Sequence, residues 1–189
     1  MWTREKFTNV CVEGDFILDG YNTLRNGSTG DWGGMKIWTR RWIVNPQTSD
    51  PKASGDGSKV NDGAGPRGYS IEFATKGGHI YFQKKLPGDT RAIYPNYNTY
   101  SQFGTYYMLG SYDTRTFSSG VKHHVAVDTI NNADGSLTLS LLIATASSSR
   151  STSTAVRRAG PPLRTEGRAG VRGDEADFRL DNLQISSVG

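Results

Sequence analysis

The sequence predicts an all-β protein that folds as an antiparallel β-sandwich or jelly roll. Apolar and polar residues alternate in many short segments along the 189 residues. Clusters of Gly, Asn, Asp and Pro separate these segments, and no segment shows a convincing helical period. Many short strands with a hairpin rhythm and no helices are typical of two antiparallel sheets that pack face to face.

The first half of the chain contains four regions with strand patterns. FTNVCVEGDFILDGYNTL predicts two short strands that break at Gly14. WGGMKIWTRRWIV predicts one long strand with Trp38 and Trp42 on the same face. GYSIEFAT alternates between apolar and polar positions, and HIYFQKKL follows it after a compact glycine turn.

The second half adds the strand TYYMLGSY, a hairpin, and the last strand DFRLDNLQIS. In the hairpin, VKHHVAVDTI and SLTLSLLI flank NNADG, whose Asp134 and Gly135 suit a tight turn. The apolar positions of both strands alternate, so we expect these side chains in the core between the sheets: Val125, Val127, Leu137, Leu139, Leu141 and Ile143.

Two segments interrupt the strand pattern. Residues 45–68 are rich in Gly, Pro and Ser, which predicts a long loop. Residues 144–163 offer mainly Ala, Ser, Thr and Arg where an apolar partner strand is expected. This irregular segment is either a disordered loop or the product of a reading-frame slip, because a shifted frame with G/C-rich codons reads as a turn and an apolar strand. We expect residues 1–189 to form a single domain around these two segments.

Charge and cysteine content narrow the functional classes. The net charge of +4 comes from residues 144–173, which carry six arginines and one acid. A nucleic-acid-binding protein would spread Lys and Arg along a face with interleaved rings, so we expect no nucleic-acid partner. No apolar run approaches the length that crosses a bilayer, so we expect no membrane association. The one cysteine, Cys11, excludes an internal disulfide and is expected to be a small buried hydrophobe.

The segment GGHIYFQKKLPGDT carries the most informative alternation. Ile80, Phe82 and Leu86 share one face with Lys84, and the opposite face is polar and ring-bearing. That polar face holds His79, Tyr81, Gln83 and Lys85. It is either a solvated sheet face or a binding groove, since Gln and Lys bind sugar hydroxyls or carboxylates and Tyr can stack or donate a hydrogen bond.

Three long segments resemble the concanavalin A-like jelly-roll superfamily, and most closely its laminin-G-like and glycan-processing modules from secreted bacterial proteins. They are GYSIEFATKGGHIYFQKKLPGDTRAI, FSSGVKHHVAVDTINNADGSLTLSLLI and GRAGVRGDEADFRLDNLQI. The resemblance covers most of residues 7–187 and lies in the strand arrangement. The glycoside hydrolase pattern E-x-D-x-x-E is absent, and the alginate-lyase-like pattern R-x-E-x-R followed by Q-[IV]-H is not matched.

This resemblance implies a substrate groove on one sheet and an extracellular or periplasmic location, with a signal peptide removed or upstream. The function it favours is polysaccharide or oligosaccharide recognition by a monomeric module of a longer protein. Rings with neighbouring amides suit a sugar face, so Tyr94, Tyr97 and Tyr100, expected on a loop, extend the binding surface of Tyr81, Gln83 and Lys85. Equally, these loop tyrosines could pack on the sandwich end.

The first alternative is a polysaccharide lyase that acts by β-elimination on a uronate polymer. Such a lyase must neutralise a carboxylate, remove the adjacent proton and protonate the leaving oxygen. Arg41, Gln83 or Lys85 could neutralise the carboxylate, and His79 or a tyrosine could be base or acid, although alternation puts Arg41 opposite Trp38 on its strand. A hydrolase needs two facing carboxylates, and the mid-strand acids Glu72 and Asp128 have no obvious mates.

Two further expectations concern metals and protein partners. Glu13, Asp15 and Asp181 lie near the two ends of the chain, and sandwich termini often pair, so these acids could hold a structural calcium ion. Solvated turn acids are the competing interpretation, and no cofactor is required. His123 and His124 point to opposite faces of one strand, which makes His123 a core residue. The second alternative function is a structural or adhesion domain that binds protein.

Overall fold

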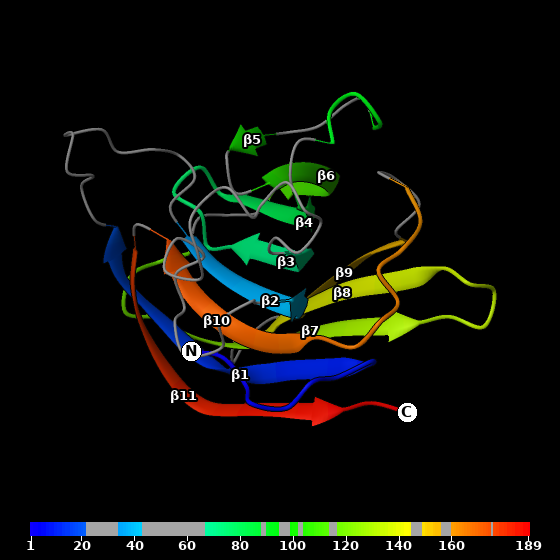
Figure 1. Ribbon diagram of the computed structural model, residues 1–189. Helices are drawn as coiled ribbons and strands as arrows, with labels where there is room; N and C mark the ends of the chain where they lie inside the picture. The colour runs from blue at the N-terminus through cyan, green and yellow to red at the C-terminus, as the bar shows by residue number, and fades with distance from the viewer. Residues whose placement is uncertain are drawn as a thin grey trace.

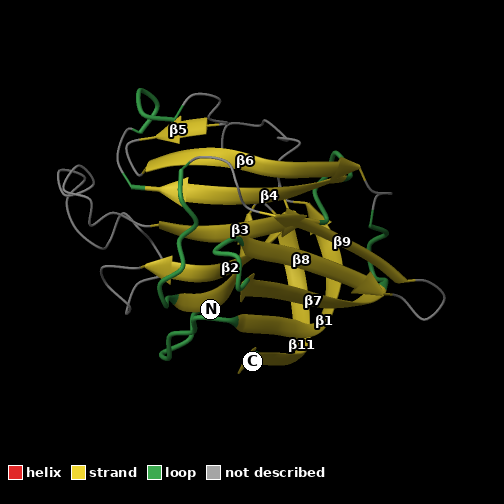
Figure 2. Ribbon diagram, turned by 90° about the vertical axis from the view of Figure 1, so that its right-hand side faces the viewer, coloured by secondary structure: helices red, strands yellow, loops and turns green. Residues whose placement is uncertain are grey.

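The computed structural model describes residues 1–21, 34–42, 67–87, 90–94, 99–101, 104–113, 117–144, 149–155, 160–174 and 176–189. Within these residues the chain forms strands, turns and no helix, which confirms the all-β prediction. The strands make two antiparallel sheets that pack into a sandwich consistent with a jelly roll (Figure 1, Figure 2). None of the described residues lies in a helix long and apolar enough to span a bilayer.

The five-stranded sheet has the order β11-β1-β7-β8-β9. Its members are β1 (Val10–Tyr21), β7 (Lys122–Asn131), β8 (Leu137–Ala144), β9 (Ser149–Ala155) and β11 (Ala176–Ser187). The six-stranded sheet has the order β10-β2-β3-β4-β6-β5. Its members are β2 (Gly34–Trp42), β3 (Arg67–Phe73), β4 (His79–Leu86), β5 (Thr99–Ser101), β6 (Gly104–Asp113) and β10 (Arg168–Asp174).

The core lies between the two sheets, as the alternation predicts. Along β7 and β8, Val125, Val127, Leu137, Leu139 and Leu141 are buried, and Ile143 packs against them partly buried. From the facing sheet, every second residue of β3 and β4 enters the same core: Tyr69, Ile71, Phe73, Ile80 and Phe82. Each such side chain contributes about 1.5–3 kcal/mol when it leaves water, so these two sets determine which face of each sheet turns inward.

The first strand differs from its prediction, because Gly14 lies inside one continuous strand. The pairing of β1 with β11 shifts register between Glu13 and Asp15. A Cβ at Gly14 would lie 3.1 Å from the Leu183 Cα, so glycine here permits the close approach of β11. Cys11 is partly exposed on the outer face rather than buried in the core. Burial and a hydrogen bond with Asp128 raise the pKa of its thiol to about 12, so Cys11 is a poor nucleophile.

Three strands were not predicted: β5, β9 and β10. Strand β9 lies within the irregular segment 144–163 and pairs antiparallel with β8. The pairing runs from Thr138 opposite Ala155 to Ala144 opposite Ser149. The two hypotheses for that segment, a loop and a frame slip, stay predictions. Of the predicted loop 45–68, Arg67 and Gly68 begin β3, and the rest lies outside the described residues.

Residues 1–7 lie along the outer edge of β10. Trp2 forms an antiparallel bridge with Gly170, and Phe7 forms another with Gly167. The Thr3 amide donates to the Ala169 carbonyl at 2.9 Å. This segment therefore covers an edge of the six-stranded sheet that would otherwise present unpaired backbone groups.

Candidate functional site

The outer face of the six-stranded sheet, turned away from the core, holds a group of polar and aromatic side chains with little exposure to solvent. Trp38 is 1% exposed, Lys85 3% and Gln83 4%. Burial of so many polar groups is costly unless they are paired, and such groups concentrate at functional sites. We call this group the outer-face cluster, and its members are Lys36, Trp38, Arg41, Ser70, Glu72, Gln83, Lys85 and Tyr106.

A β-bulge brings Arg41 into the cluster. The register of β2 against β3 shifts between Thr39 and Trp42, and Arg40 takes a left-handed backbone with φ of 51°. Because one extra residue fits into the bulge, Arg41 turns to the same face as Trp38. The prediction that these two residues lie on opposite faces was wrong, because simple alternation does not include a bulge.

The Arg40 side chain holds this bulge in place. Its guanidinium donates to the Asn131 Oδ1 at 2.7 Å and to the Leu163 carbonyl at 2.9 Å. The backbone of Arg40 also lies against Gly167, where an added Cβ would fall 2.3 Å from the Arg40 carbonyl carbon. These contacts offset the cost of about 1–3 kcal/mol for a left-handed non-glycine residue.

Lys85 and Tyr106 form the chemically most distinctive pair of the cluster. They face each other across β4 and β6, and the Lys85 Nζ donates to the Tyr106 Oη at 3.1 Å. Burial, reinforced by the charges of Arg41, Lys36 and Arg172, lowers the pKa of the Lys85 amine to about 7. Near neutral pH, Lys85 is therefore a mixture of amine and ammonium and can accept a proton.

Among the described members of the cluster, positive charge exceeds negative charge. The Lys36 Nζ pairs with the Glu72 Oε2 at 3.1 Å, and both side chains are nearly buried. Glu72 supplies the one carboxylate among the described members of the cluster, against Lys36, Arg41 and Lys85. The remaining polar members bond to each other, since the Ser70 Oγ donates to the Gln83 Oε1 at 3.2 Å. An anionic ligand would balance the excess charge.

The structure brings together four of the residues that the sequence singled out. Tyr81, Gln83 and Lys85 share the outer face of β4, and Arg41 joins them through the bulge. His79 lies at the start of β4 with its ring 5.6 Å from the Tyr81 ring. Ile80, Phe82 and Lys84 face the core as predicted. Burial lowers the pKa of the Lys84 amine to about 8, and its Nζ donates to the Pro161 carbonyl at 2.8 Å.

Of the three loop tyrosines, the structure describes the side chain of Tyr94, which does not join the cluster. The Tyr94 ring packs edge-on against Tyr107, whose hydroxyl bonds to Thr90. This contact matches the alternative in which such tyrosines hold a loop to the sandwich. Tyr97 lies outside the described residues, and Tyr100 belongs to β5 with its side chain outside the description.

The acids near the chain ends lie on the outer face of the five-stranded sheet. Asp15 pairs with Asp181 in register and bonds to Lys122, Asn182 and His124. Among the described residues, no three His, Cys, Asp or Glu side chains are grouped to hold a metal ion. The structure therefore adds no support to calcium binding by Glu13, Asp15 and Asp181, which stays a prediction.

His123 and His124 point to opposite faces, as predicted. The His123 ring is buried between Phe16, at 5.4 Å, and Phe117, at 4.7 Å, measured between ring centroids. Neither ring nitrogen has a hydrogen-bond partner within the described part of the chain, so His123 is a core residue without the polar partners that buried histidines usually have. Burial lowers its pKa and favours the neutral ring.

Sequence reasoning missed Tyr106, Lys36 and Trp2. Tyr106 was predicted only as part of the strand TYYMLGSY, because its contact with Lys85 depends on the register between β4 and β6. The Lys36 and Glu72 pair had a detectable signal, because these residues lie opposite each other once β2 and β3 are aligned by their apolar positions.

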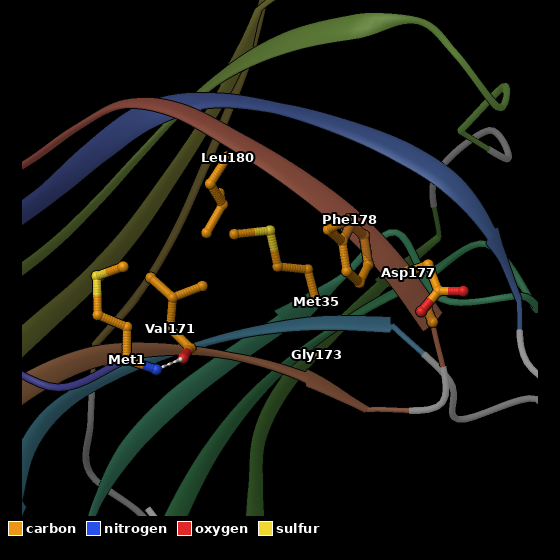
Figure 3. Close-up of a pocket in the computed structure, with 8 residues that line it drawn as sticks. Met1, Met35, Val171, Gly173, Asp177, Phe178 and Leu180 are labelled. Carbon is orange, nitrogen blue, oxygen red and sulfur yellow. Dashed lines mark hydrogen bonds between the residues drawn. The ribbon is translucent and has the colours of Figure 1, made fainter.

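A separate pocket lies between the sheets at the β10 and β11 edge, with a volume of about 280 Å³ (Figure 3). Its described lining is mostly apolar, with Met35, Val171, Phe178 and Leu180 beside Asp177. It lies on the core side of β2 and β10, away from Lys85 and Tyr106. The described lining holds Asp177 and no His, Cys, Ser, Lys or Arg side chain, so the outer-face cluster is the stronger candidate.

Solved structures share the fold of this chain. An alginate lyase of the PL-14 group from Aplysia kurodai superposes with a TM-score of 0.53 at 10% identity, over 96% of this chain and 70% of that one. The alginate lyase Aly36B has a TM-score of 0.36 at 14% identity, over 97% and 71% of the two chains. Scytalido-glutamic peptidase has a TM-score of 0.36 at 10% identity, over 95% and 70%.

At such low identity, the first likeness establishes the sandwich fold alone, and the two weaker ones support no function. No protein-family model matches the chain, and neither does any curated protein sequence. The resemblance to the concanavalin A-like superfamily stays a prediction.

Proposed function

We propose that this protein is a polysaccharide lyase that cleaves a uronate polymer by β-elimination at the outer-face cluster. The observation that carries the proposal is the buried Lys85 amine, with a pKa of about 7, at 3.1 Å from the Tyr106 hydroxyl. A general base works best when its pKa lies near the operating pH, and a hydroxyl beside it can serve as the acid.

The reaction follows from these two groups. The neutral Lys85 amine removes the proton on C5 of the uronate, next to the carboxylate. The electron pair forms a C4=C5 double bond as the bond from C4 to the glycosidic oxygen breaks, and the Tyr106 hydroxyl protonates that oxygen. The proton on Lys85 then returns to the Tyr106 oxygen across their hydrogen bond, which restores both groups.

The proposed roles differ in part from the sequence-based ones. Lys85 was assigned to charge neutralisation and His79 to acid–base work, whereas burial favours Lys85 as the base. Arg41 keeps the role of neutralising the substrate carboxylate, a contact that forms when the substrate binds. Gln83 lies beside Lys85 on β4 and can donate a hydrogen bond to the same carboxylate.

The excess of positive charge favours an acidic polymer over a neutral glycan. Arg41, Lys36 and Arg172 all act on the Lys85 amine through their charges, so a bound carboxylate gains attraction from several cations. Tyr81 and Tyr106 are partly exposed and can contact the sugar rings, while access to the nearly buried Lys85 requires the site to open. A location outside the cytoplasm, where such polymers accumulate, belongs to this proposal.

The second candidate is a glycan-recognition module that binds without cleaving. The partly exposed rings of His79 and Tyr81, 5.6 Å apart, favour it, because a binding module needs only an aromatic platform with polar edges. The lowered pKa of Lys85 is the feature that recognition alone does not require. We therefore rank the lyase first.

An absorbance assay near 235 nm separates the two candidates. The protein is mixed with alginate, with glucuronan and with a neutral glucan, and the lyase predicts rising absorbance on a uronate polymer only. Migration through gels that contain the same polymers is measured in parallel. Retardation with flat absorbance would favour the binding module. Flat absorbance without retardation would contradict both candidates and leave the adhesion domain.

A further inference from the structure

The Arg41 guanidinium packs against two neighbouring indole rings. Its Cζ atom is 4.1 Å from the centroid of the Trp38 ring and 4.9 Å from that of Trp2. The two indoles themselves are 6.5 Å apart, with an angle of 53° between their planes. A guanidinium that packs against two aromatic rings is attracted by both, and this attraction increases when the group is buried.

Trp2 reaches Arg41 because its chain segment is bonded to β10. The amino group of Met1 donates to the Val171 carbonyl at 2.9 Å (Figure 3), and the Val171 amide donates to the Met1 carbonyl at 3.0 Å. The Thr3 amide and hydroxyl both bond to Ala169. The backbone on both sides of Trp2 is therefore attached to the sheet.

Gly170 leaves room for the Trp2 ring on the outer face. A Cβ at this position would clash with the Trp2 ring, so any other residue here would displace the indole. Ala169 and Val171, on either side of Gly170, point into the core. The Trp2 indole thus lies directly on the sheet, beside Trp38, at the β10 edge of the outer-face cluster.

Trp2 holds Arg41 without adding negative charge. A carboxylate partner would orient the guanidinium equally well, but it would cancel the charge that an acidic substrate needs. Contact with the two rings restricts where the guanidinium can lie, and a guanidinium held in this way can form a two-point contact with a carboxylate. Arg41 has further interactions in the structure, and the rings add to them.

We infer that Trp2 is a positioning residue for acidic substrate, which orients Arg41 so that its guanidinium binds the carboxylate of a uronate. This inference rests on the proposed function. It extends the site from the sheet to the N-terminal segment and assigns a role to a residue far from Lys85 in the sequence. Because Trp2 acts on the carboxylate contact and not on proton transfer, its loss should weaken binding more than turnover.

The test compares Trp2→Leu with Trp2→Phe in the full chain. Both side chains cover Gly170 with apolar surface, but only phenylalanine offers a ring face to Arg41. We expect Trp2→Leu to raise KM for the uronate polymer about tenfold with kcat nearly unchanged, and Trp2→Phe to stay close to the wild type. Lys6→Ala is the control. It changes the same N-terminal segment by removing the exposed ion pair between Lys6 and Glu166, and it should change neither KM nor kcat.

Affinity electrophoresis on the same polymer is run beside the turnover assay, so that binding is measured even without cleavage. Urea unfolding of each variant reports its folding separately. Equal KM and affinity in the leucine and phenylalanine variants would overturn the inference, and so would a fall in kcat as large as the rise in KM. A wild type that neither binds nor cleaves uronate polymers would overturn the proposed function, and the inference with it.

Discussion

The outer faces of the two sheets carry similar polar residues, but a lysine ammonium is stabilised on one face and destabilised on the other. On the five-stranded sheet, Lys122 contacts Asp15 at 2.8 Å, and its side chain is 53% exposed. Hydrogen bonds from Lys122, Asn182 and His124 hold the pKa of Asp15 well below its usual range. On the six-stranded sheet, Lys85 is buried and its pKa falls to about 7. One lysine keeps its charge beside a carboxylate, and the other loses it easily.

The comparison shows which surroundings make a lysine able to exchange a proton near neutral pH. Water and an opposite charge stabilise both members of the Lys122 and Asp15 pair, so neither has a proton to exchange near neutral pH. Lys85 has three cations near it and little water, so its ammonium form is destabilised. A fold that maintains such an arrangement loses stability by it, which is the usual signature of a functional site.

Replacing the two lysines should give the largest contrast between the faces. Lys85→Met removes the proposed base and should lower kcat/KM on a uronate polymer by about 100-fold or more. Lys122→Met should leave kcat/KM unchanged, because Lys122 lies on the other sheet. Both are measured by the absorbance of the unsaturated product. Residual activity of Lys85→Met near the wild-type value would remove Lys85 from the mechanism.

The pH dependence of activity should report the Lys85 amine. Only the neutral amine can accept a proton, and it becomes scarce as the pH falls through about 7. We expect kcat/KM to fall about tenfold per pH unit below that value. Rates measured from pH 5 to 9 check this slope. A profile that stays flat down to pH 5 would mean that a carboxylate or no base at all is used.

Replacing Lys85 should raise the stability of the fold while it lowers activity. The folded pKa of Lys85 lies below its unfolded value of about 10.4, so the unfolded chain binds more protons between these values. This lysine therefore destabilises the fold at low pH, and its contribution improves as the pH rises from about 7 to 10. Lys85→Met should raise the free energy of unfolding at pH 7 by on the order of 2 kcal/mol.

Urea unfolding at pH 7 and at pH 10 measures this effect, and the gain in the methionine variant should shrink at the higher pH. Lys122→Met is the matched control on the exposed face, where no gain is expected. A loss of stability in Lys85→Met would show that the amine is held by favourable contacts.

The smallest effect is expected at Asp15. Because its folded pKa is depressed, the stability it contributes is present above its unfolded pKa of about 3.9 and is lost as the pH falls further. The Asp15 side chain is 16% exposed and its partner Lys122 is 53% exposed, so solvent screens the pair. Asp15→Asn should therefore shift the urea midpoint only slightly at pH 7 and leave activity unchanged. A marked loss of activity would mean that the five-stranded sheet also takes part in the function.

Particular residues show how far the sequence predicts the site. The alternation of β4 correctly separates Tyr81, Gln83 and Lys85 from Ile80 and Phe82, because strand geometry is local and has a period of two residues. The alternation of β2 fails at Arg41, because the bulge that turns it is held by contacts from Arg40 to distant parts of the chain. Local patterns do not contain those contacts.

The sequence by itself determined the fold class, the core faces of β4, β7 and β8 and the polar face that carries the candidate site. Only the tertiary structure decided that Lys85 meets Tyr106, that Trp2 lies on Arg41, and that Lys85 loses its charge near pH 7. The physical reason is that both the strand register across long connections and the burial of a side chain depend on contacts with many residues that are distant in the sequence.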